Sequence, residues 1–173
     1  IQTLAERLTL LDPALLPRLP LLGIVLNLPI PDNDLTRSLD AKLRKTSLEA
    51  LLVDCLRARV RGADSGRAPH MLILEDTHWL DPLSGDLVDV LGRAIADLPV
   101  MVVLSYRPPE IDRLQAPSVS LLPHFTEVAL QDFSPDEARQ LILLKVEQLT
   151  GAQAAVPPAF VEQLTARAKG NPF

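Results

Sequence analysis

Two carboxylates and one arginine stand just after short apolar runs, where their side chains could act on a metal ion and a phosphate. Glu75 and Asp76 follow the run 70–74, and Arg107 lies three residues after the run 100–104. Adjacent carboxylates supply the hard oxygen ligands that suit Mg²⁺, held directly or through water. A planar guanidinium suits the oxygens of a phosphate. The residue types therefore indicate metal and phosphate chemistry.

A strand, a helix and a second strand are expected to position these three residues. Apolar runs without polar alternation are typical of parallel strands that are buried on both faces. Between the runs, Asp81 can cap a helix and Pro82 suits its first position. The apolar stripe of this helix comprises Leu83, Leu87, Leu91, Ala94, Ile95 and Leu98. In such a right-handed βαβ unit, ligands bind at the carboxyl ends of the strands, so we expect Glu75, Asp76 and Arg107 at one edge.

The rest of the chain reads as helices and one weaker strand. Residues 1–31 are expected to form short helices interrupted by prolines, and residues 40–61 one helix. The buried stripe of that longer helix comprises Leu48, Leu51, Leu52, Cys55 and Leu56. A weaker strand is predicted at 125–130. A capping box at Ser134 predicts a helix that runs to about Thr150. A last helix should run from about Pro158 to Gly170, with this glycine as its C-cap.

Three motifs carry a resemblance to a known family. The stretch 71–82, Met-Leu-Ile-Leu-Glu-Asp-Thr-His-Trp-Leu-Asp-Pro, resembles the Walker B region of the AAA-like signal-transduction ATPases with numerous domains, the STAND class. It is most similar to the ATPase modules joined to class III adenylate/guanylate cyclases, some serine/threonine kinases and large LuxR-type regulators. The strand 100–104 with Ser105 to Pro108 resembles the sensor-1 strand of that family. Residues 170–172, Gly-Asn-Pro, are similar to its Gly-x-Pro motif.

The resemblance implies a fold and a division of the chain. The implied fold is α/β, a three-layer P-loop NTPase-like parallel sheet that is partial, with its first strand and P-loop missing, followed by a helical lid. Residues 1–130 would be the distal part of the ATPase core, which contains the Walker B and sensor-1 strands. Residues 131–173 would be the lid that runs into the Gly-Asn-Pro motif.

The resemblance also implies roles for individual residues, with ATP and Mg²⁺ as cofactors. Glu75 would help to hold Mg²⁺, usually through water. Asp76 would share the metal and polarise the attacking water. Arg107 would sense the γ-phosphate, and Gly170 and Pro172 would lie near the adenine. Glu precedes Asp here, whereas the general family pattern places Asp at the metal position; the extra methylene of glutamate is compatible with coordination through water.

Three further residues of the Walker B-like stretch have less specific roles. His78 could support a metal ligand from behind or be purely structural. Trp79 is expected to pack against other side chains, and Asp81 is expected to cap the following helix.

Both carboxylates at the strand end could also belong to a simple turn, and Arg107 could instead pair with Glu110.

The sequence contains no Gly-x4-Gly-Lys-Ser/Thr string, which is the loop that wraps the β-phosphate in P-loop proteins. The stretch 62–67 has neither the spacing nor the lysine. We therefore expect that this chain is a piece of a longer protein and that it does not bind ATP alone. The resemblance implies an effector domain in the same parent chain: a cyclase, a kinase or a DNA-binding domain.

Composition limits the function classes. The 173 residues carry a net charge of −5, 47% hydrophobic and 23% charged residues, which is typical of one soluble domain. The acidic balance disfavours direct nucleic-acid binding. No apolar run reaches the roughly 20 residues of a membrane span. The lone Cys55 predicts a reducing, cytoplasmic setting. The basic cluster of Arg37, Lys42, Arg44 and Lys45 is interpreted as a solvated helix face.

These observations favour the ATP-dependent regulatory switch of a multidomain signalling protein, with ATPase activity in the parent. One alternative is a metal-dependent hydrolase built on Glu75, Asp76, His78 and Asp81, which is disfavoured because a single histidine makes a poor transition-metal set. The other alternative is a non-catalytic adaptor with a degenerate ATPase fold, which would bind other proteins through its leucine-rich helices.

Overall fold

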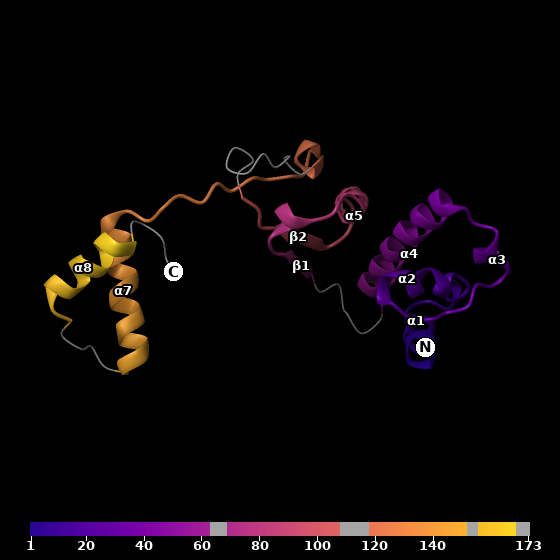
Figure 1. The fold of residues 1–173 in the computed structure, drawn as a ribbon, viewed down its shortest axis with the longest axis horizontal. Coiled ribbons are helices and arrows are strands. Elements are labelled where there is room, and N and C mark those ends of the chain that lie inside the picture. The colour runs from indigo at the N-terminus through magenta and orange to yellow at the C-terminus, as the bar shows by residue number, and fades with distance from the viewer. Residues whose placement is uncertain (63–68, 108–117, 152–155, 169–173) are drawn as a thin grey trace. The chain divides into compact units, whose positions relative to one another are not determined.

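The computed structural model describes residues 1–62, 69–107, 118–151 and 156–168. The chain divides into two compact units, Ile1–Thr126 and Glu127–Phe173. Figure 1 labels the helices and strands of both units.

The first unit begins with helices that are interrupted by prolines, as the sequence predicts. Asp12 ends the first helix, and its carboxylate then accepts a hydrogen bond from the backbone N–H of Ala14 at 2.8 Å. Pro17 and Pro20 lie inside the next segment, where their missing N–H groups favour the tighter 3₁₀ form over an α-helix. The helical elements are α1 (Gln2–Leu11), η1 (Pro13–Leu21), α2 (Leu22–Leu26), α3 (Asp34–Arg37) and α4 (Ala41–Arg61).

A leucine core joins these helices. Its buried members are Leu8, Leu15, Leu21, Leu22 and Leu51. The predicted stripe of α4 faces this core, because Leu51 is fully buried and Leu48, Leu52 and Cys55 pack around the cluster. Burial raises the pKa of the Cys55 thiol, which favours its uncharged and unreactive form. Cys55 is therefore a packing residue, as expected.

A cluster of polar groups around the buried Thr36 connects the loop before α3 to α4. The Thr36 hydroxyl is fully buried and donates a hydrogen bond to Asp32 at 2.8 Å. Arg44 reaches both carboxylate oxygens of Asp32, at 2.9 and 3.0 Å, and donates to the Thr36 carbonyl. Arg44 was expected on a solvated face, but its side chain is only 23% exposed. Arg44 therefore has a structural role, because its bidentate ion pair with Asp32 holds α4 against the loop.

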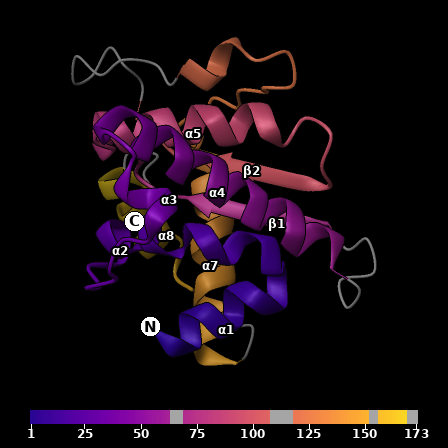
Figure 2. The same cartoon turned by 90° about the vertical axis from the view of Figure 1, so that its right-hand side faces the viewer.

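The predicted strand–helix–strand segment is present. Strands β1 (His70–Leu74) and β2 (Val100–Leu104) pair in parallel, with His70 opposite Val100 and Leu74 opposite Leu104. Figures 1 and 2 show the two strands side by side. Helix α5 (Pro82–Ala94) lies between them in sequence and begins at Asp81, as expected.

A short 3₁₀ turn, η4 (Ser118–Leu121), packs closely on α5. A Cβ on Gly92 would lie 2.9 Å from a methyl of Leu122 and 3.0 Å from a methyl of Val119. The carbonyl of Gly92 also lies 2.8 Å from Nε2 of His124. A larger residue at this position would require the Leu122 and Val119 side chains to shift.

The expected three-layer P-loop NTPase-like sheet is wrong. The described residues contain one sheet of two strands, and most of their regular structure is helical. The weaker strand predicted at 125–130 is irregular. An apolar run shows that a segment tends to be buried but not how many strands lie beside it. Within the described part of the first unit, Met71, Ile73 and Met101 on one face of this sheet are 59%, 58% and 57% exposed.

The second unit contains α7 (Pro135–Thr150) and α8 (Pro158–Ala168). The predicted capping box is confirmed, since the Ser134 backbone N–H donates to the Glu137 carboxylate at 2.9 Å and the Ser134 hydroxyl caps the backbone N–H of Glu137. Helix α7 ends at Gly151 in the left-handed conformation. The predicted cap of α8, Gly170, lies outside the described residues. Among the helices that are described, none has the length and apolar character needed to cross a bilayer.

Candidate functional site

The loop that carries the two carboxylates is tied to the end of the neighbouring strand. Ser105 follows β2 and donates its backbone N–H to the carbonyl of Leu74 at 2.9 Å. In return, the Asp76 N–H donates to the Ser105 hydroxyl at 3.2 Å, and the Thr77 N–H donates to the Ser105 carbonyl at 2.9 Å. The Thr77 hydroxyl donates to the same carbonyl at 3.1 Å. Ser105 thus holds the first turn after β1 in place.

Asp76 has a strained backbone. Its φ is 53°, in the left-handed region that residues with a Cβ adopt at a cost of about 1 kcal/mol or more. The same residue begins the short turn η3 (Thr77–Trp79). Strained residues of this kind gather at functional sites, because the surrounding hydrogen bonds must hold them. The observation singles out Asp76 within the acidic pair.

The acidic pair, Glu75 and Asp76, could supply only some of the ligands of a metal ion. Glu75 and Asp76 are both exposed, and the Asp76 side chain is 75% exposed. No group of three or more His, Cys, Asp or Glu side chains within the described ranges is placed to bind a metal. Mg²⁺ commonly keeps several waters and takes one or two carboxylates together with phosphate oxygens. The donor set therefore fits a hydrated Mg²⁺ that also contacts a phosphate, and it does not fit a metal enclosed by protein ligands.

His78 lies buried behind this pair. Its side chain is only 3% exposed, and its Nδ1 lies 4.0 Å from the Asp76 Oδ1, beyond hydrogen-bond distance. Neither ring nitrogen has a hydrogen-bond partner in the part of the chain that the structure describes. The ring contacts the Trp79 indole with the two centroids 5.0 Å apart. His78 is therefore a buried polar side chain beside Asp76, and no pattern in the sequence indicates its burial.

Trp79 and Asp81, later in the same stretch, differ in how well they match the expectation. Trp79 was expected to pack against other side chains; it contacts the His78 ring, but the residue is 77% exposed, so most of it does not pack. Asp81 caps α5 as expected, accepting from the N–H groups of Leu83 and Ser84 at 2.9 and 3.1 Å. The Ser84 hydroxyl, followed by the Ser84 N–H, holds the pKa of Asp81 below its ordinary value. With its oxygens engaged in the cap, Asp81 is poorly placed to serve as a metal ligand, which further disfavours the hydrolase alternative.

Arg107 is exposed and follows Ser105 by two residues, so its backbone continues from the edge at which Glu75 and Asp76 lie. The structure thus brings these three predicted residues to the same end of the sheet. The other predicted binding residues, Gly170 and Pro172, lie outside the described residues, as does Glu110.

Sequence reasoning gave no role to Ser105. The register places Leu74 opposite Leu104, so Glu75 and Ser105 are the first residues beyond the paired strands. A small hydroxyl residue at that position can accept from and donate to the adjacent turn. The signal was present in the spacing, but it becomes informative only once the strand register is known.

Comparison with known proteins finds a distant relative. The chain is 29% identical over 146 residues, or 84% of its length, to an uncharacterized protein, R02095, of Rhizobium meliloti (strain 1021). It spans only 13% of the length of that protein. No family model matches the chain. No solved structure matches it either.

Proposed function

We propose that this chain supplies the metal-binding side of a nucleoside triphosphate site in the regulatory switch of a longer signalling protein. The observation that carries the proposal is the Glu75–Asp76 pair, which Ser105 holds at the end of β1 with Asp76 in a strained conformation. The resemblance of the stretch 71–82 to the Walker B region of STAND ATPases supports ATP as the nucleotide.

Each residue at the sheet edge has a distinct role under this proposal. Glu75 and Asp76 would hold a hydrated Mg²⁺, and such an ion would supply positive charge to the phosphate oxygens. Asp76 also accepts a hydrogen bond from the attacking water and orients it toward the γ-phosphorus. Arg107 contacts the γ-phosphate oxygens. His78, which is buried next to Asp76, helps to position the turn that carries that carboxylate.

The phosphate anchor must come from elsewhere, because the sequence contains no phosphate-wrapping glycine loop. We place this anchor in the parent protein, together with a cyclase, kinase or DNA-binding effector. Gly170 and Pro172 stay assigned to the adenine side on resemblance alone. A cytoplasmic location is proposed on the single cysteine. By itself the chain should hold ATP weakly.

ATP hydrolysis by the longer protein that contains this chain tests the proposal. Asp76→Asn should lower kcat by about a hundredfold and leave KM for ATP within about threefold, because the water is misoriented while the phosphate contacts remain. Asp136→Asn, which removes an exposed carboxylate on α7, is the matched control. Unchanged turnover in the Asp76 variant would refute the assigned role.

The second candidate is an adaptor without catalysis. It is favoured by three consecutive exposed apolar side chains on α2, Ile24, Val25 and Leu26, which are 71%, 57% and 47% exposed. Contiguous exposed apolar surface is typical of protein interaction sites. An adaptor predicts no ATP turnover in the longer protein, so the hydrolysis assay separates the two functions.

A further inference from the structure

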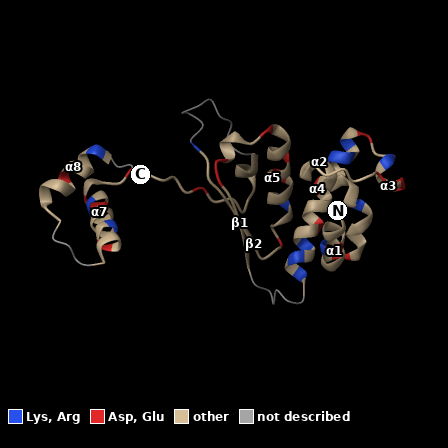
Figure 3. Ribbon diagram, turned by 60° about the horizontal axis from the view of Figure 1, so that its bottom comes forward, with Lys and Arg blue, Asp and Glu red and all other residues tan. Residues whose placement is uncertain are grey.

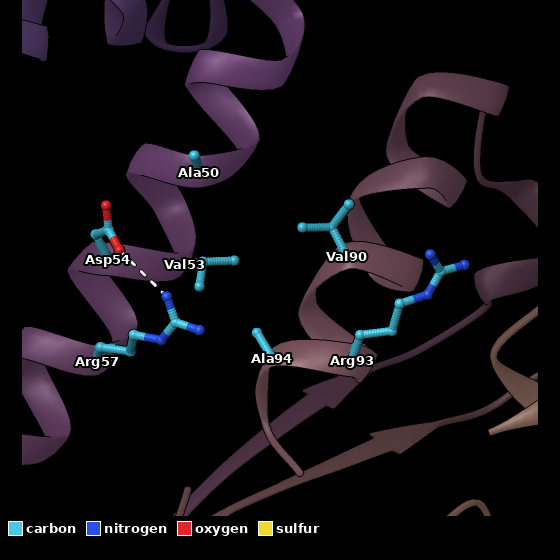
Figure 4. A pocket seen from close by; sticks show the side chains of 7 residues that line it. All are labelled: Ala50, Val53, Asp54, Arg57, Val90, Arg93 and Ala94. Atoms are coloured by element: carbon cyan, nitrogen blue, oxygen red, sulfur yellow. Dashed lines mark hydrogen bonds and ion pairs between the residues drawn. The ribbon is translucent and has the colours of Figure 1, made fainter. Parts of the chain in front are cut away.

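A groove separates α4 from α5 within the first unit. Its lining contains small apolar side chains, Ala50 and Val53 of α4 and Val90 and Ala94 of α5. Figure 4 shows Val53, Val90 and Ala94 directed toward one another across the gap. The groove has a volume of about 400 Å³ and is open to solvent. The facing side chains are thus too small to close the space between the two helices.

Ion pairs hold the two helices at one end of this groove. Lys45, in the first turns of α4, pairs with Asp86 of α5. The same ammonium lies 3.4 Å from a carboxylate oxygen of Glu49, which is 9% exposed. The apolar lining lies further along both helices. The pairing therefore joins the helices at their N-terminal parts while leaving the groove beyond it open.

The groove carries positive charge at its other end. Arg57 extends from α4 beside the apolar lining (Figure 4), and its guanidinium lies 3.4 Å from Asp54. Asp54 is shared, because Arg18 also contacts it at 2.9 Å. An adjoining hollow of about 350 Å³ is lined by Arg18, Arg57 and Arg61. Figure 3 shows basic residues gathered at the C-terminal turns of α4. Asp12 and Asp54 also line these hollows, and Arg93 of α5 lines the groove. Two carboxylates thus face four guanidinium groups in a chain whose net charge is −5.

We propose that this groove binds an acidic amphipathic helical segment of a partner protein. Apolar side chains of the segment would fill the space between Val53, Val90 and Ala94, as in helix-in-groove recognition. An acidic side chain on the same segment would pair with Arg57, whose fork geometry suits a carboxylate. The positive charge of the arginines at this end of the groove favours an acidic partner over a basic one. The inference is independent of the nucleotide site at the sheet edge.

Binding of a labelled model peptide to the full chain tests this inference. The probe is an amphipathic peptide of about 15 residues, with leucines at helical spacing and glutamates beside them. A second peptide carries lysine in place of each glutamate. Fluorescence anisotropy is measured with the unmodified chain, with Arg57→Glu and with the groove-filling variant Ala94→Trp. The matched controls are Arg139→Glu and Leu149→Trp, at exposed positions on α7.

The acidic peptide should bind, and the lysine peptide should not. Arg57→Glu and Ala94→Trp should each weaken binding at least about tenfold, whereas the α7 controls should not change it. Thermal melts followed by circular dichroism confirm that each variant is folded. If Arg57→Glu does not fold, Arg57→Gln is measured in its place. The proposal is overturned by absent binding, by equal loss in the controls, or by inorganic phosphate binding Arg57 without the peptide. It is also overturned if Ala94→Trp merely converts a dimer of this chain into monomers.

Discussion

Asp76 combines an exposed carboxylate with a backbone conformation that glycine would adopt more easily. Three hydrogen bonds from this turn to Ser105 hold it in that conformation. Retaining a charged side chain at a strained position is consistent with a role for the carboxylate, because stability alone favours glycine there. The adjacent Glu75 shows no such constraint.

Substitutions at Asp76 should reveal this strain. We expect Asp76→Gly to be at least as stable as the unmodified chain, because glycine adopts φ near 53° without steric conflict. Asp76→Ala should be less stable than Asp76→Gly by about 1 kcal/mol. Urea unfolding of the three proteins measures the difference. Equal stability of the Gly and Ala variants would show that the turn is not strained.

Asp32 should make stability depend on pH. The hydrogen bond from Arg44, followed by that from Thr36, holds the pKa of Asp32 below its ordinary value of 3.8. A folded pKa below the unfolded one adds stability above the unfolded value, and this contribution is lost as the pH falls through the folded value. Asp32→Asn should therefore lower Tm at pH 7 but change it little under strongly acidic conditions. A difference in Tm that is constant with pH would contradict the pairing.

At the scale of elements, local signals were the most informative. The starts of α5 and α7 follow from Asp81-Pro82 and Ser134-Pro135, because a cap and an N1 proline act within one turn. The two strands were predictable from their continuous apolar runs. The 3₁₀ form of η1 was not predicted in detail, although its prolines marked an interruption. The packing of Gly92 against η4 depends on a segment distant in sequence.

The cap of α5 gives a prediction at this scale. Asp81→Ala removes the acceptor for two backbone N–H groups and should lower Tm by about 3 °C. Because Asp81 acts as a cap rather than as a metal ligand, the same variant should leave metal binding at Glu75 and Asp76 unchanged. Differential scanning calorimetry measures the first effect, and a Mn²⁺ titration followed by NMR measures the second. Loss of metal binding would return Asp81 to the candidate ligands.

At the scale of the whole molecule, the sequence could not predict how many strands share the sheet. Local apolar runs identified β1 and β2, but the described sheet stops at two strands and leaves Met71, Ile73 and Met101 exposed. The candidate site was partly predictable, because the sequence shows an acidic pair directly after an apolar run that is typical of a strand. The hydrogen bonds from the turn after β1 to Ser105 depend on strand register, and the burial of His78 depends on tertiary packing. No local sequence pattern encodes either.

Paramagnetic NMR with Mn²⁺ tests the central claim, metal binding at the end of β1, most directly. Mn²⁺ takes the same hard oxygen ligands as Mg²⁺ and broadens nearby resonances. We predict selective broadening at Asp76 and Ser105, enhanced by ATP and abolished by Glu75→Gln combined with Asp76→Asn. The adjacent pair Asp136 and Glu137, at the start of α7, is the internal control. Equal broadening at that pair, or none at Asp76, would contradict a metal site at the sheet edge.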